Sequence, residues 1–159
     1  MGLDVELAEI RDFLAAHAPF DDLPPQVLER LPTKLRVEYF RRGTSIISNG
    51  ADNFSLYVVR SGAVELHDTH GRFLDRCGEG MAFGSLTLVS GNPASFSATA
   101  IEDTLCLVMD ATTFNELSET QLSFRGYFDL QRSSRMHGAV ASLHTAVSGG
   151  AILKTKVTD

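Results

Sequence analysis

Apolar and polar residues alternate with a helical period at the start of the chain. Apolar side chains recur every three or four positions, with charged residues between them, at Leu3, Leu7, Ile10 and Leu14. This spacing predicts an amphipathic helix that ends near Pro19. Pro24 and Pro25 indicate the first turn of a second short helix, whose apolar face would carry Val27, Leu28 and Leu31. We therefore expect residues 1–31 to form an N-terminal helical segment.

From residue 32 the period changes to two, and it persists in short bursts up to residue 110. Glycines separate the bursts, and glycine readily adopts the positive φ that tight hairpin turns require. The pattern predicts strands over residues 35–40, 44–47, 54–60, 63–68, 72–77, 95–101 and 105–109. Many short strands with regular turns are typical of a barrel or a sandwich, so residues 32–110 are expected to form a β-barrel.

Helical character returns after residue 110, where Asp110 is placed to cap a helix that carries Phe114 and Leu117. A longer helix follows, with apolar residues along one side and Arg132 and Arg135 on the other. Its apolar residues are Leu122, Tyr127, Leu130, Met136, Val140 and Leu143. We expect these C-terminal helices to cover residues 111–148.

The helical pattern breaks at Gly149 and Gly150, and a short apolar run, AILKTKV, follows. Two interpretations stay open, because such a run can be a frayed end or the first strand of a following domain. Residues 149–159 are therefore interpreted as a linker or as the start of a further domain.

Composition narrows the function classes. With 159 residues, of which 43% are hydrophobic, the chain can bury one real core. A net charge of -6, from 14 basic and 20 acidic residues, argues against nucleic acid as the main partner. No apolar run approaches the ~20 residues of a membrane-spanning helix, and Asp4 and Glu6 do not suit a signal peptide. We expect a cytoplasmic domain without a membrane partner.

Metal binding and catalysis are both disfavoured by the residue pattern. Cys77 and Cys106 lack the paired spacing of thiolate metal sites and are interpreted as free thiols in strands. His67 and His70 could belong to a cupin-like metal site, but they lie in a predicted turn, which favours solvated side chains. The chain has no nucleophile elbow, P-loop lysine or carboxylate cluster, so we do not expect an enzyme.

The most informative segment interrupts the β pattern with a short helical piece, SLTL, entered through Gly84. A glycine that opens a helix exposes unpaired backbone N–H groups, which with the helix dipole can bind a phosphate. The hydroxyls of Ser95 and Ser97 follow on the next strand and could donate to the same anion. The alternative is a bulge or helical turn that only closes the barrel.

The segments LYVVRSGAVEL, GEGMAFGSLTL and SATAIEDT, in this order and spacing, resemble the cyclic-nucleotide-binding domain family over residues 18–145. The resemblance implies a mainly β fold with flanking α, an eight-stranded jelly-roll barrel with N-terminal and C-terminal helices. It also implies a phosphate-binding cassette at residues 82–97 and C-terminal helices that move. The ligand-binding residues it implies are Phe83, Gly84, Ser85, Leu86, Thr87, Ala94, Ser95, Phe96 and Ser97.

Two cassette positions depart from the family's pattern. Ser85 stands where a glutamate usually holds the ribose hydroxyl, and Ala94 stands where an arginine usually pairs with the cyclic phosphate. Loss of that arginine alone predicts binding weaker by roughly tenfold to a hundredfold. Phe96 is also bulky where the family usually has a small residue. Among the strand arginines that could supply the missing charge are Arg60, Arg72 and Arg76.

Two functions follow as hypotheses. The first is a regulatory sensor that binds cyclic AMP, another nucleotide or a small anion, requires no cofactor and signals through the C-terminal helices. The second is a ligand-free barrel that forms a homodimer or docks another domain through the helix at residues 120–145. A catabolite-activator-like regulator would need a helix-turn-helix after Val147, which the sequence does not show. The tail resembles the entry to a CBS-domain pair, as in bacterial signalling proteins that also carry a predicted nucleotidyltransferase domain, so following domains are expected.

Overall fold

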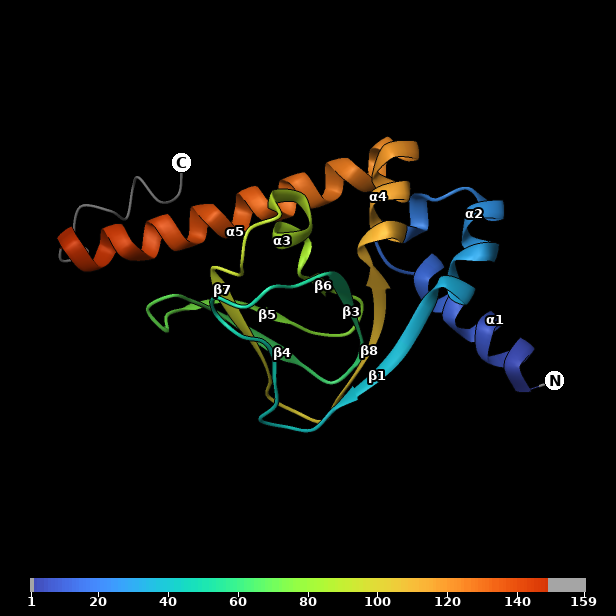
Figure 1. Cartoon of the computed structure of the whole chain (residues 1–159), viewed down its shortest axis with the longest axis horizontal. Helices are drawn as coiled ribbons and strands as arrows, with labels where there is room; N and C mark the ends of the chain where they lie inside the picture. The colour runs from blue at the N-terminus through green and yellow to red at the C-terminus, as the bar shows by residue number, and fades with distance from the viewer. Residues whose placement is uncertain (1, 149–159) are drawn as a thin grey trace.

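Two antiparallel sheets face each other in the computed structural model, which describes the backbone of residues 2–148 and the side chains of residues 5–135 (Figure 1). The first sheet has the strand order β1 (Leu35–Phe40), β8 (Thr104–Asp110), β3 (Ser55–Ser61) and β6 (Ala82–Phe83). The second has the order β2 (Ser45–Ile47), β7 (Phe96–Ala100), β4 (Val64–Asp68) and β5 (Phe73–Cys77). Strands β6 and β5 are therefore edge strands of different sheets.

The expected mainly β jelly-roll with flanking helices is confirmed. The predicted strands agree with the observed ones to within a residue at most ends, and the pairs are antiparallel throughout the described sheets. The prediction missed β6, because two residues are too few to show a periodic pattern.

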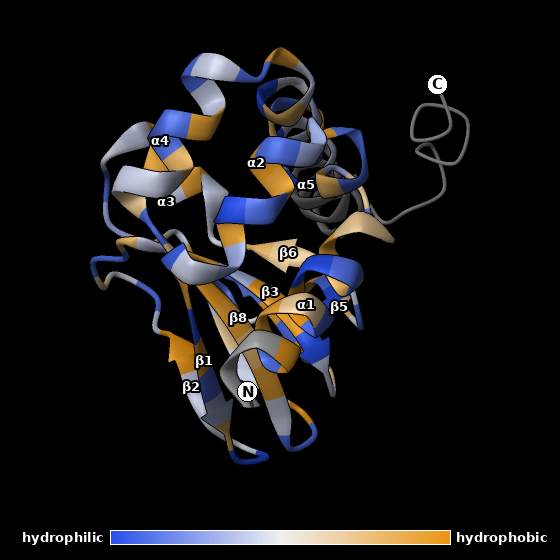
Figure 2. Cartoon of the chain, turned by 90° about the vertical axis from the view of Figure 1, so that its right-hand side faces the viewer, coloured by the Kyte–Doolittle hydropathy of each residue, from blue (hydrophilic) through white to orange (hydrophobic). Residues whose placement is uncertain are grey.

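The central strands β3 and β8 are buried on both faces, and Figure 2 shows how hydrophobic they are. Successive side chains of a strand point to opposite faces. Val59 and Val108 therefore point between the two sheets, whereas Val58 and Leu107 point toward the helices. The described residues thus form two apolar clusters, one inside the barrel and one between the first sheet and the helices.

Helices from both ends of the chain cover the outer face of the first sheet (Figure 1). The N-terminal elements are α1 (Gly2–Ala15), η1 (Phe20–Asp22), α2 (Pro25–Arg30) and η2 (Leu31–Lys34). The C-terminal elements are α4 (Ala111–Thr120) and α5 (Leu122–Ser148). The Asp110 side chain caps α4 by accepting a hydrogen bond from the Thr113 N–H at 2.9 Å, as the sequence predicts, and this bond lowers the pKa of Asp110.

The buried face of α5 differs from the predicted one. Leu122 and Leu130 are 79% and 74% exposed, whereas Phe124 and Phe128 are fully buried beside Phe114, with ring centroids 5.0–5.7 Å apart. The prediction was wrong because it placed Leu122 and Leu130 on the buried face of the helix, whereas the helix buries the face that carries Phe124 and Phe128. Met136, Val140 and Leu143 lie outside the residues whose side chains are described, and residues 149–159 lie outside the described residues.

We expect Phe128→Ala to lower the free energy of unfolding by about 3–5 kcal/mol, because it leaves a cavity in a packed aromatic cluster. Leu130→Ala, on the same helix but exposed, should change it by less than about 0.5 kcal/mol. Urea denaturation followed by circular dichroism measures both. Equal losses in the two variants would contradict the described orientation of α5.

Candidate ligand site

The cassette begins with a left-handed glycine. Gly84, at φ 102°, separates β6 from α3 (Ser85–Ser90), and Gly91, at φ 74°, ends that helix. The short helix entered through Gly84 is thus confirmed. A Cβ at Gly84 would lie 2.7 Å from the Ser55 carbonyl oxygen, so the backbone fits here only with glycine.

Asn53 fixes the cassette against β3. Its Nδ2 donates to the Ser55 carbonyl oxygen at 2.9 Å and to Thr87 Oγ1 at 2.8 Å. The Thr87 hydroxyl in turn donates to the Gly84 carbonyl oxygen at 3.0 Å. The Thr87 hydroxyl therefore holds the cassette together from within.

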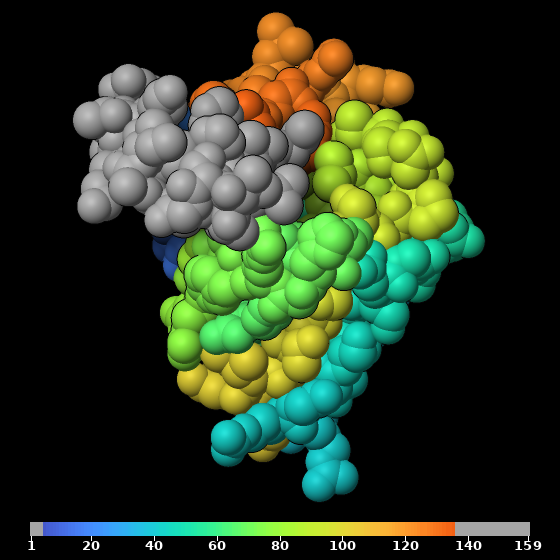
Figure 3. All heavy atoms as spheres, turned by 90° about the vertical axis from the view of Figure 1, so that its left-hand side faces the viewer, coloured from blue at the N-terminus to red at the C-terminus, as the bar shows by residue number. Residues whose placement is uncertain are grey.

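A cavity of about 110 Å³ lies between the cassette, the second sheet and α5. Figure 3 shows this face, with α3 in yellow-green directly beneath α5 in orange. The cavity is lined by Leu66, Asp68, Leu74, Gly84, Ser85, Leu86, Ser95, Phe96, Arg132 and Arg135. Cassette and C-terminal helix are thus two walls of one space.

Five of the nine predicted ligand residues line this cavity: Gly84, Ser85, Leu86, Ser95 and Phe96. The other four do not. Phe83 stacks on Tyr57 inside the barrel with ring centroids 5.1 Å apart, and the residues Thr87, Ala94 and Ser97 also lie away from the cavity wall. For Ser97 the reason is strand alternation, which turns it to the face opposite Phe96.

The cavity wall contains a buried hydroxyl that the described residues do not satisfy. The Ser85 side chain is 1% exposed, and its Oγ has no hydrogen-bond partner among the described residues. An unpaired buried hydroxyl costs about 1–3 kcal/mol. Phe96, which is 7% exposed, forms part of the wall but leaves the cavity open.

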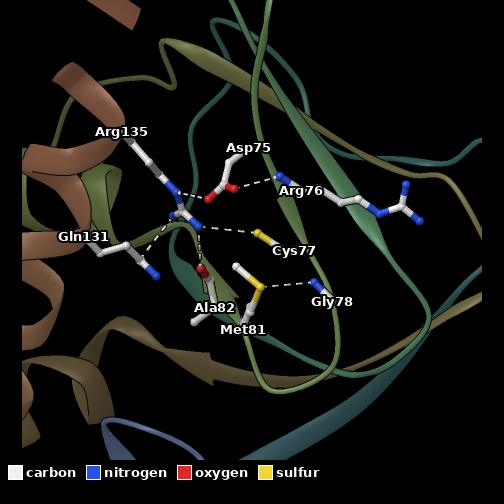
Figure 4. Close-up of polar contacts among 8 residues, drawn as sticks. All are labelled: Asp75, Arg76, Cys77, Gly78, Met81, Ala82, Gln131 and Arg135. Atoms are coloured by element: carbon white, nitrogen blue, oxygen red, sulfur yellow. Dashed lines mark hydrogen bonds and ion pairs between the residues drawn. The ribbon is translucent and has the colours of Figure 1, made fainter. Parts of the chain in front are cut away.

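Arg135 of α5 contacts the edge strands of both sheets (Figure 4). Its Nε donates to Asp75 Oδ2 at 3.1 Å on β5. Its Nη2 donates to Cys77 Sγ at 3.4 Å on β5 and to the Ala82 carbonyl oxygen at 3.1 Å on β6. Its Nη1 donates to Gln131 Oε1 at 3.1 Å, one turn earlier on α5. We call these four contacts the Arg135 anchor.

Arg132 is the second guanidinium in the cavity wall. Its side chain is 15% exposed and pairs with Asp129, which is 52% exposed and lies one turn earlier on the helix. None of the three strand arginines considered from the sequence lines the cavity, and the Nη1 of Arg72 is buried without a hydrogen-bond partner among the described residues. Arg60 lies 4.5 Å above the Phe13 ring, and Arg76 pairs with Glu102 at 3.6 Å. The two helix arginines were not predicted as site residues, because the sequence pattern places them on the polar side of α5.

The third charged residue of the wall is Asp68. Its Oδ1 accepts the N–H groups of Arg72 at 2.8 Å and of His70 at 2.9 Å. These two hydrogen bonds, that of Arg72 above all, lower the pKa of the carboxyl, so Asp68 is ionised at neutral pH. The cavity therefore presents two guanidinium groups and one carboxylate.

Comparison with known proteins assigns this architecture. Residues 37–121 match the family model described as the cyclic nucleotide-binding domain, which is more than half of the chain. The chain belongs to the cyclic nucleotide-binding domain family. Within the family, the mouse (Mus musculus) cGMP-dependent protein kinase 2 is 30% identical over 129 residues, which cover 75% of this chain but 17% of the kinase. The similarity is thus to a small part of that enzyme.

Solved structures of cyclic nucleotide-binding domains share the fold. The regulatory domain of Toxoplasma gondii PKA with cAMP superposes with a TM-score of 0.73 at 19% identity, covering 80% of this chain and 49% of that one. The regulatory subunit of a cAMP-independent protein kinase A from Trypanosoma cruzi, bound to guanosine, has a TM-score of 0.64 at 18% identity. It covers 80% of this chain and 51% of that one.

Three further features of this cyclic nucleotide-binding domain concern its thiols, metal binding and membrane-spanning helices. Cys77 and Cys106 are free and buried, in β5 and β8 as expected, and burial raises their pKa to about 11 and about 12. Within the described residues, no group of three or more His, Cys, Asp or Glu could hold a metal ion. No described helix is long and apolar enough to cross a membrane.

We expect Gly84→Ala to destabilise the domain more than Gly91→Ala. Both positions have positive φ, which costs a non-glycine residue about 1–3 kcal/mol, but only at Gly84 does a Cβ meet a backbone oxygen. Thermal denaturation measures the difference. A smaller loss at Gly84 than at Gly91 would contradict the close approach to Ser55.

The raised thiol pKa values predict a loss of stability in alkali. In the unfolded chain the thiols ionise near their ordinary pKa of 9.0, whereas the folded thiols ionise near 11 and 12. The unfolded state thus binds fewer protons above pH 9, so the free energy of unfolding should fall as the pH rises toward 11. In Cys77→Ala/Cys106→Ala, urea titrations should show a shallower fall. An unchanged slope would mean that the thiols are not responsible.

Proposed function

We propose that this domain is a regulatory sensor that binds a small ligand of the nucleotide class in the cavity and transmits its presence through α5. The proposal rests on one observation, which is that the cassette and α5 line the same cavity. Ser85 and Ser95 of the cassette line the same cavity as Arg132 and Arg135 of α5. A ligand in this space contacts both elements, so its affinity depends on where α5 lies.

The structural neighbours support a ligand of this class. One of them holds cAMP, and another, named as cAMP-independent, is bound to guanosine. The fold therefore accepts both a cyclic nucleotide and an uncharged nucleoside. In this chain Ser85 and Ala94 remove the two side chains expected to recognise a cyclic nucleotide, so cyclic AMP is one candidate ligand among several.

Regulation without catalysis follows from the same proposal. A ligand that favours one position of α5 shifts the population toward that position, by at most its difference in affinity for the two states. The output would then belong to other domains of the parent protein, for which the CBS-domain pair suggested by the tail is our candidate. No step in this scheme requires a cofactor or a catalytic residue.

A ligand-free interaction module is the second candidate function. The cavity of about 110 Å³ is small beside the roughly 300–1,000 Å³ of typical ligand pockets. Leu122 and Leu130 are exposed on α5, where they could form a homodimer contact. The unpaired Ser85 hydroxyl favours the sensor, because a barrel that never receives a ligand gains nothing from it.

Ligand binding predicts a rise in melting temperature. At a ligand concentration of 100 times Kd, stability should increase by about 2.7 kcal/mol. The probes are cAMP, cGMP, 5′-AMP and guanosine, each measured by differential scanning fluorimetry. Ser95→Trp should abolish the rise by filling the exposed mouth of the cavity, and Asn92→Trp, exposed but outside the wall, should retain it.

No rise with any probe would contradict the sensor and favour the interaction module. A rise that survives Ser95→Trp would place the ligand outside this cavity.

A further inference from the structure

We propose that Arg132 of α5 supplies the positive charge that the cassette lacks, so that a singly charged anionic ligand is bound between the Arg132 guanidinium and the Ser85 hydroxyl. This inference rests on the ligand-binding function proposed above and specifies its chemistry. In consequence, the charge that holds the ligand would come from the helix that carries the signal.

The Ser85 hydroxyl supplies the first contact. It lines the cavity, is buried, and has no partner among the described residues. A hydroxyl can donate to an anion or accept from a neutral donor, so Ser85 alone does not select the ligand's charge. The choice depends on the charged groups around it.

Arg135 is not free to serve as the second contact. Its Nε and both Nη atoms already donate to Asp75, Gln131, Cys77 and Ala82. A ligand that bound this guanidinium would have to replace contacts to both edge strands. Arg135 therefore positions α5, and the cation for a ligand must come from elsewhere.

Among the described residues, Arg132 has one carboxylate partner, Asp129, which lies on the same helix and is half exposed to solvent. Water competes for this half-exposed carboxylate, so the ion pair between neighbouring helical turns is weak. Asp129 is also shared, since Arg125 lies 4.0 Å from its other carboxylate oxygen. Arg132 can therefore turn from Asp129 to an anion in the cavity without leaving a buried charge unpaired.

Asp68 limits the charge of the ligand. It is an ionised carboxylate in the same wall, and its hydrogen bonds to backbone N–H groups leave its negative charge in place. Asp75 pairs with Arg135, which leaves Arg132 to balance one negative charge of the ligand, and the Asp68 carboxylate makes a second negative charge unfavourable. The expected ligand is a monoanion, such as a phosphodiester, in preference to a phosphate monoester with its charge of about -1.5 to -2.

The test is a set of NMR titrations of the ¹⁵N-labelled 159-residue chain with cAMP, cGMP, 5′-AMP and guanosine. We expect the cyclic nucleotides to bind more tightly than 5′-AMP. Arg132→Gln should weaken cyclic-nucleotide binding by roughly tenfold to a hundredfold and leave guanosine binding within about twofold. A purely structural role for Arg132 would weaken all probes alike.

Two further variants sharpen the result. Asp129→Asn removes the competing carboxylate and should tighten cyclic-nucleotide binding. Arg125→Gln removes an arginine that also pairs with Asp129 but does not line the cavity, so it should leave the affinity within about twofold.

The outcomes separate the two proposals. If no probe binds the wild-type chain, the sensor function fails and this inference fails with it. If guanosine alone binds, or if Arg132→Gln binds cyclic nucleotides as tightly as wild type, the sensor stands and the role of Arg132 is overturned.

Discussion

The position of α5 over the cavity depends on one side chain, Arg135. The edge strands β5 and β6 belong to different sheets, and an edge strand leaves backbone groups unpaired. The Met81 carbonyl oxygen points toward β3 and accepts a hydrogen bond from the Val59 N–H. The next carbonyl, that of Ala82, therefore points away from the sheet and accepts a hydrogen bond from Arg135. Asp75 provides the countercharge. A single guanidinium thus fastens the helix to both sheets beside the cavity.

In the proposed sensor, recognition moves from the cassette to the helix. The cassette retains its backbone form, held by Gly84 and by the Asn53 amide, but Ser85 and Ala94 bring no charge to it. The guanidinium groups of the wall come from α5 instead. A ligand bound by the helix itself needs no intermediate element to report its presence, which is the physical basis of the proposed sensor.

Local patterns predicted the fold, and tertiary contacts decided the site. The strands, the Asp110 cap and the helix after Gly84 depend on neighbouring residues, so the sequence revealed them. The amphipathic pattern of α5 led to a wrong prediction for Arg132 and Arg135, because it assigns arginines to the solvent-exposed face of a helix. Phe128 and Arg135 are seven residues apart, which is two helical turns, and this spacing was the signal that Arg135 shares the buried side. Its acceptors on β5 and β6 could not be foreseen.

The central claim, that the Arg135 anchor holds α5 over the cavity, is tested most directly by electron paramagnetic resonance. Spin labels at Ser134→Cys on α5 and Arg41→Cys on the barrel replace exposed residues, while the native thiols are buried and have raised pKa values. The account predicts one narrow distance distribution, which Arg135→Gln broadens and shifts to longer distances. A distribution that Arg135→Gln leaves unchanged would contradict it.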